Sequence, residues 1–148
     1  SYSGWGYLYV DWNGNVSPCV FMPYSPVNIH DVYAQGKNLN DLWAAPFFGG
    51  LRNWQKSYQQ KQGNWLQPCP IRDHHTEFRR LIAEYEPEPI DENARAALLD
   101  PEYARGLEKY GAEYQKMSDP IWESQYLQPL NPTNDDFRPL PNIDQGKG

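Results

Sequence analysis

The side chains of this chain with the clearest capacity for chemistry are two cysteines and a short run of a carboxylate and two imidazoles. Cys19 follows an Asn-Gly pair, and Cys69 lies between two prolines with Asp73, His74 and His75 just downstream. Thiolate, imidazole and carboxylate groups are the common protein ligands of zinc and iron. Adjacent histidines point in different directions in regular structure, so we expect at most one of them to share a site with Cys69.

The first cysteine is expected just after a β-hairpin. Residues 7–12 are rich in aromatic and β-branched side chains, and Asn13-Gly14 is the strongest short-range hairpin signal because both turn positions need positive φ. The return strand is predicted over residues 16–21. Pro18 cannot donate to a sheet ladder, so we expect irregular backbone at Cys19, where the sulfur can turn toward a ligand.

The second cysteine is expected in an extended loop. Pro68 and Pro70 flank Cys69, which argues against a regular helix at this position. We predict that Cys19 and Cys69 lie close in space, because the hairpin and this loop converge on one site. A disulfide between the two cysteines is the alternative use of that proximity, since an even cysteine count permits it.

Helices are predicted around these two thiol-bearing segments. Asn38 or Asn40 can cap a helix, and Pro46 suits the first turn of the next one. Apolar side chains recur at helical spacing over residues 76–85. Further helices are predicted to begin at Asp91 or Asn93, at Asp100-Pro101 and at Asp119-Pro120. A hairpin followed by helices predicts an α+β fold.

Three segments after the hairpin carry a family resemblance. They are Val27-Asn28-Ile29-His30-Asp31-Val32, Asn38-Leu39-Asn40-Asp41-Leu42-Trp43 and Ala45-Pro46-Phe47-Phe48-Gly49-Gly50-Leu51-Arg52. In this order, behind Gly14-x4-Cys19, they resemble the SPASM and twitch domains, the auxiliary-cluster domains of radical S-adenosylmethionine (SAM) enzymes. The resemblance implies the twitch architecture, a β-hairpin with helices on one face.

The resemblance also implies a ligand set. Cys19 and Cys69 would be thiolate ligands of an iron–sulfur cluster, and a [4Fe–4S] cluster is normally held by four cysteines. The C-x2-C and C-x3-C runs that follow in a full SPASM domain are absent, and the family's earlier cysteine would fall at or just before Ser1. His75, His74 or Asp73 would then replace a missing ligand.

The function implied is that of an accessory domain of a radical SAM enzyme, which holds a cluster and covers the mouth of the catalytic barrel. The C-x3-C-x2-C loop that binds the SAM-cleaving cluster is absent, so we expect no radical chemistry from this chain alone. The expected partner is a radical SAM catalytic domain or a larger complex. One alternative is a non-catalytic assembly subunit that keeps the fold, has lost the cluster, and docks on a larger complex through its aromatics and extended tail. Another is a zinc-stabilised module with Cys19, Cys69 and one or two histidines.

Composition sets the domain organisation and excludes some partners. We predict a SPASM/twitch-like module over residues 1–75, a helical extension over 76–127 and an extended, proline-rich tail over 128–148. A net charge of −6 without a basic helix argues against nucleic acid or an anionic membrane as the partner. The chain has no apolar run long enough to span a bilayer and no signal-peptide pattern, so a cytoplasmic origin is expected.

Overall fold

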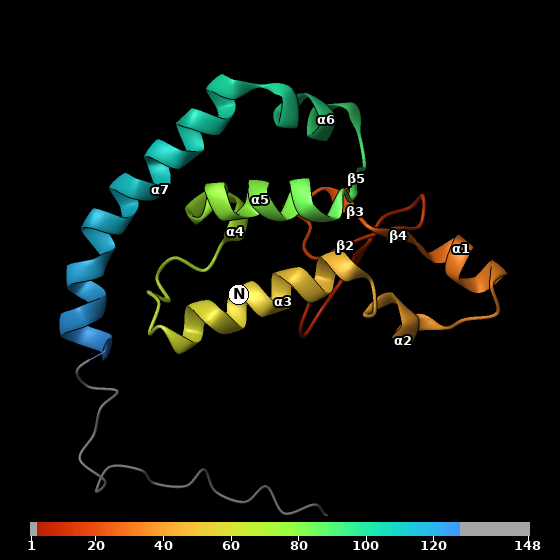
Figure 1. Cartoon of the computed structure of the whole chain (residues 1–148), viewed down its shortest axis with the longest axis horizontal. Coiled ribbons are helices and arrows are strands. Elements are labelled where there is room, and N and C mark those ends of the chain that lie inside the picture. Colours follow the sequence, from red (N-terminus) through yellow and green to blue (C-terminus); the bar gives the residue numbers. More distant parts are fainter. Residues whose placement is uncertain (1–2, 128–148) are drawn as a thin grey trace, which may run out of the picture.

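A computed structural model describes residues 3–127, in which small antiparallel sheets near the N-terminus are followed by seven α-helices (Figure 1). Strands β1 (Tyr9–Val10), β2 (Asn15–Ser17) and β4 (Val27–Asn28) form a sheet with β2 in the centre. Strands β3 (Tyr24–Ser25) and β5 (Glu88–Pro89) form a second, two-stranded sheet. The α+β prediction is confirmed. The predicted tail at 128–148 and the ligand position at Ser1 lie outside the described residues.

The hairpin forms at the predicted place with a different turn. Tyr9 pairs with Ser17 and Val10 with Val16, and the Asp11 and Gly14 backbones close the loop through a 3.0 Å hydrogen bond. Gly14 alone in the turn has positive φ, at 83°, so the expectation of two such positions is wrong. A three-residue loop, in which a tight turn precedes one left-handed residue, needs glycine only at its last position.

The return strand is shorter than predicted. Strand β2 ends at Ser17 because Pro18 has no N–H to continue the ladder. Cys19 then begins a tight turn in which the Met22 N–H donates to its carbonyl at 3.0 Å. The expectation of irregular backbone at the first cysteine is therefore confirmed.

Local signals place most of the helices. Asn38 caps α2 in a capping box with Asp41, Pro46 occupies the first turn of α3, and the Asp91 side chain accepts from Ala94 N–H at the start of α6. The helices are α1 (Ile29–Ala34), α2 (Leu39–Leu42), α3 (Pro46–Gln60), α4 (Pro70–Asp73), α5 (His75–Tyr85), α6 (Glu92–Leu99) and α7 (Pro101–Ile121), and the π-helical turn η1 (Trp122–Leu127) follows.

Two helix predictions are corrected by the structure. The backbone of Cys69 is extended as expected, but the four-residue α4 begins directly after it, because Pro70 suits a first helical position. Asp119-Pro120 does not start a new helix. Helix α7 runs through Pro120 to Ile121, near its C-terminal end, and the wider η1 turn follows directly.

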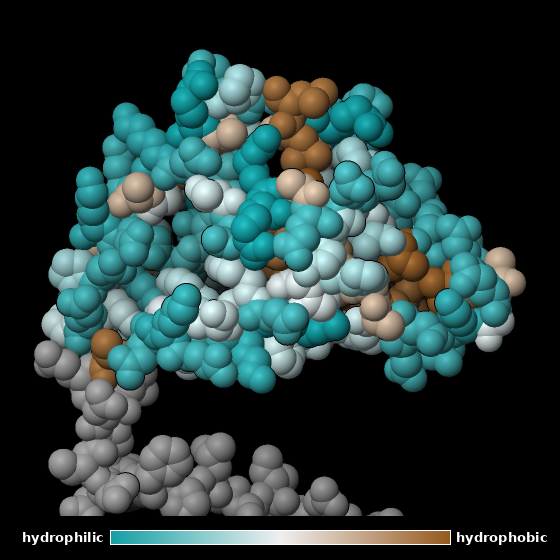
Figure 2. Space-filling view, in the orientation of Figure 1, coloured by the Kyte–Doolittle hydropathy of each residue, from teal (hydrophilic) through white to brown (hydrophobic). Residues whose placement is uncertain are grey.

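The core lies between the sheets and the helices α3 and α5. Its largest fully buried side chains include Met22, Phe47, Phe48 and Phe78. Helices α3 and α5 lie side by side, and α7 runs along one side of the molecule next to α4 and α5 (Figure 1). The face in Figure 2 is largely hydrophilic, with apolar side chains gathered where α6 meets α7. Within residues 3–127, no helix combines the length and apolar character needed to cross a membrane.

Candidate thiolate site

Cys19 is held beside a tyrosine from the first segment of the chain. Its side chain is half-buried and packs against the core. The Tyr7 hydroxyl donates to the Cys19 Sγ at 3.7 Å, and Ser3 Oγ lies 3.2 Å from the same hydroxyl. A short polar chain therefore runs from Ser3 through Tyr7 to the first thiol.

Cys69 stands at the entrance to α4. Its N–H donates to the Asp73 carboxylate at 3.0 Å, which fixes the backbone that carries the thiol. Burial raises the pKa of the Cys69 thiol, and the negative charge of Asp73 acts in the same direction. The backbone N–H groups of Ile71 and Arg72 oppose this rise, although the Cys69 side chain forms no capping hydrogen bond to the helix. In this environment the thiol form is favoured until a cation or a metal stabilises the thiolate.

Tyr7 connects the two cysteines electrostatically. Its hydrogen bond with Ser3 lowers the pKa of the phenol, but the bond to Cys19, burial and the charges of both Cys19 and Cys69 raise it, and the net shift is upward. One phenol is thus within electrostatic range of both thiols. Both cysteines are free, so the disulfide alternative is not realised in this structure.

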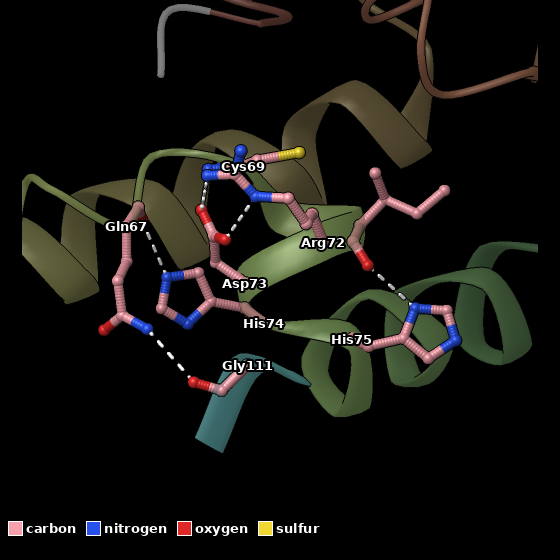
Figure 3. A network of polar contacts seen from close by, with 8 residues as sticks. Gln67, Cys69, Arg72, Asp73, His74, His75 and Gly111 are labelled. Carbon is pink, nitrogen blue, oxygen red and sulfur yellow. Dashed lines mark hydrogen bonds and ion pairs between the residues drawn. The ribbon is translucent and has the colours of Figure 1, made fainter. Parts of the chain in front are cut away.

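The Asp73 carboxylate forms hydrogen bonds and an ion pair within the fold. Its carboxylate is fully buried and forms a bidentate ion pair with Arg72, with Nε to Oδ1 at 2.6 Å and Nη2 to Oδ2 at 2.9 Å. In Figure 3 the carboxylate points toward the guanidinium group of Arg72. Together with the Cys69 N–H, these bonds occupy the oxygens that would otherwise be offered to a metal.

The two histidines point in different directions, as adjacent residues were expected to do (Figure 3). His74 Nε2 lies 2.9 Å from the Gln67 carbonyl, and its ring packs edge-on against Trp54 and Tyr58. His75 Nδ1 lies 2.9 Å from the Ile71 carbonyl, on the far side of α4. Burial lowers the pKa of His75, so the neutral ring is favoured.

These placements bear on the proposed ligand set. Within residues 3–127, no three His, Cys, Asp or Glu side chains gather in a way that could hold a metal ion. Tyr7 contacts Cys19 and its phenol also feels the charge of Cys69, while Asp73, His74 and His75 have other partners. A [4Fe–4S] cluster normally takes four thiolates, and the whole chain has two cysteines. The residues present therefore fit part of a cluster site and do not complete one.

Sequence reasoning missed Tyr7, whose role depends on a contact twelve positions along the chain. It also missed Gln67 and Asn64, which are buried and bonded to α7. No local pattern marks these residues. The neighbouring Pro-Cys-Pro sequence is the only signal that this segment is held in one position.

Cys19 follows a small antiparallel sheet and Cys69 precedes a helix, and thiols held in this way are the kind of group that binds metals or clusters. Residues 2–71 match the family model of SPASM, described as an iron-sulfur cluster-binding domain. No curated protein and no solved structure matched the chain. Residues 2–71 are therefore a SPASM domain, the auxiliary iron–sulfur domain found in radical SAM enzymes, and the resemblance of residues 14–52 is confirmed.

Proposed function

We propose that this domain supplies Cys19 and Cys69 as thiolate ligands to an auxiliary [4Fe–4S] cluster and works with a radical SAM catalytic domain. The observation that carries the proposal is the pair of free thiols, with the Tyr7 hydroxyl donating to one of them, in a chain whose residues 2–71 match an iron-sulfur cluster-binding domain. The remaining ligands would come from residues outside 3–127 or from the partner. Free thiols at both positions accord with a reducing, cytoplasmic setting.

The chain's own contribution is to position two sulfurs and to donate to one of them. The Tyr7 hydroxyl already donates to the Cys19 sulfur, and this bond would persist when the sulfur is a thiolate. Such donors to cluster sulfurs are among the factors that set a cluster's reduction potential. Bound iron would replace the protons on the two thiols and supply the electron-transfer or substrate-binding chemistry of the domain.

A face for the catalytic domain lies beside the first thiol. Trp12 at the hairpin turn is 89% exposed, and Phe21 in the turn after Cys19 is 74% exposed. Val20, next to Cys19, is also exposed. Large apolar side chains exposed in this way are typical of surfaces covered by a partner. The same observation favours the second candidate, a non-catalytic assembly subunit that docks through the hairpin. The acidic net charge supports a protein partner over nucleic acid.

Anaerobic reconstitution with iron and sulfide tests the ligand assignment. We expect Cys19→Ser and Cys69→Ser each to lower bound iron and the visible charge-transfer absorption, in the isolated chain and in the complete radical SAM polypeptide. Because the isolated chain has two cysteines, its iron content should stay below that of a full cluster. Glu77→Ala, a change on the exposed side of α5, serves as a control for handling losses. Unchanged iron in both cysteine variants would refute the assignment, and zinc retained in place of iron would favour the zinc module.

A further inference from the structure

The loop that carries Cys69 is bound along its length by one face of α7. This loop, residues 62–73, runs from the end of α3 through α4. Its partners on α7 and η1 are Gly111, Tyr114, Ser118, Asp119 and Trp122. Residues 111, 114, 118 and 122 recur at the spacing of a single helix face. These partners all lie beyond the SPASM match, which ends at residue 71.

The closest approach is at Gly111. A Cβ added there would lie 2.8 Å from the Asp73 carbonyl oxygen and 3.3 Å from its carbon, so only glycine lets α7 approach the end of α4. The Gly111 carbonyl accepts from Gln67 Nε2 at 3.4 Å, inside the protein (Figure 3). Residues on both sides of Cys69 therefore lie against Gly111, Gln67 through its side chain and Asp73 through its backbone.

Polar bonds fix the start of the loop further along α7. Asn64 Nδ2 donates to Ser118 Oγ at 2.9 Å and to Asp119 Oδ1 at 2.8 Å, and both Asn64 and Ser118 are buried. A buried amide without these acceptors would carry a desolvation penalty, so the loop has one favoured position against the helix.

Aromatic contacts complete the attachment. Trp122, placed by the η1 turn, stacks on Trp65 with ring centroids 5.8 Å apart and donates to the Gln62 carbonyl at 3.4 Å. The Arg72 guanidinium group, which pairs with Asp73, lies 5.7 Å from the centre of the Tyr114 ring. The contacts thus continue from the first residue of the loop to its last turn.

We propose that α7 is a clamp that positions the Cys69 loop, so that the helical region beyond the SPASM match is part of the thiolate site. The clamp determines the position of the Cys69 thiol, whether or not that thiol binds metal. Its importance for a cluster rests on the proposed function, in which Cys69 is a ligand. Gly111, Asn64 and Ser118 are positioning residues in this scheme, since they act on the thiol through the loop backbone.

Thiol alkylation in the metal-free chain tests the clamp. Iodoacetamide labelling of Cys69 and Cys19 is followed by peptide mass spectrometry, so Cys19 reports global unfolding in the same molecule. Gly111→Ala is expected to raise the Cys69 rate about five- to tenfold with little change at Cys19, because the added methyl group forces the loop from the helix. Gly106→Ala is the matched control, since a Cβ at Gly106 meets no atom within 4 Å.

A double variant, Ser118→Ala with Asp119→Ala, tests the same clamp without overpacking. It removes both acceptors of Asn64 and should also raise the Cys69 rate selectively. Unchanged labelling in folded variants would overturn the proposal, and so would equal rises at both cysteines in both variants. Iron retention is measured separately. A selective labelling effect without a change in iron upholds the clamp and counts against Cys69 as a ligand.

Discussion

Replacing Asp73 with alanine distinguishes between two roles of its carboxylate, a structural role in the folded chain and a role as a metal ligand. In the metal-free protein, the carboxylate accepts the Cys69 N–H and pairs with Arg72. Asp73→Ala leaves this N–H without its acceptor in a partly buried place. If the group is structural, the loss of stability should therefore be present before any metal is added.

The size of the effect follows from the exposure of the two partners. An unsatisfied buried donor costs about 1–3 kcal/mol. The Arg72 side chain is 46% exposed, so water can replace its ion pair, and such pairs contribute about 1 kcal/mol or less. We expect Asp73→Ala to lower the free energy of unfolding by about 2–3 kcal/mol, and Tm by roughly 5–10 °C for a chain of this size. Asp73→Asn keeps an acceptor oxygen for the N–H and should lose about half as much.

Chemical denaturation and thermal unfolding of the metal-free chain measure these losses. Glu77→Ala is the control, because it removes an exposed ion pair with Arg80 and should change stability by less than about 0.5 kcal/mol. If Asp73→Ala were as stable as this control and differed from the parent only in bound iron, the structural reasoning would be wrong and the ligand hypothesis for Asp73 would gain support.

Three further perturbations test the packing and the buried polar groups. Gly50→Ala should lower stability by about 1–2 kcal/mol in urea unfolding, because its Cβ would lie 2.3 Å from the Tyr85 ring, while Gly49→Ala, with no atom closer than 3.9 Å, should be neutral or stabilising. Tyr24→Phe removes a buried 3.0 Å hydrogen bond to a carbonyl of α6 and should cost about 1 kcal/mol by the same assay. Burial lowers the pKa of His75, so its contribution to stability is present above about pH 6.5 and is lost as the pH falls, when the unfolded chain takes up the proton more readily. The acid side of the stability profile should therefore be shallower in His75→Gln, and an unchanged slope would contradict this assignment.

Features governed by nearby residues were predictable from the sequence. Asn38, Pro46 and Asp91 start their helices because a side-chain oxygen or a fixed φ acts within one turn of the backbone. Pro18 ends its strand for an equally local reason. The hairpin position was predicted as well, while its turn type depended on pairing that only the folded strands define.

Features that depend on distant contacts were not predictable. Pro120 has the same Asp-Pro signal as Pro101, but α7 continues through it, and Trp122 just beyond stacks on the distant Trp65. His74 and His75 have the chemistry of ligands, yet one nitrogen of each lies at a backbone carbonyl and aromatic rings pack against both imidazoles. From the sequence, Gly111 is only a residue of low helix propensity inside α7. Its role follows from the Asp73 carbonyl, which packs against it from a distant part of the chain.

The pairing of β3 with β5 has a consequence for how the chain acquires its shape during synthesis. Strand β3 follows the hairpin directly, but its partner lies beyond α5, and the Tyr24 hydroxyl reaches a carbonyl 70 positions later. Contacts of such high sequence separation form late, because a long loop must close first. A nascent chain that has emerged only as far as α3 therefore has β3 without its partner strand. Its Tyr24 hydroxyl also lacks the carbonyl that accepts its hydrogen bond in the folded protein. Tyr24 would reach its final surroundings only after the distant strand has emerged and paired.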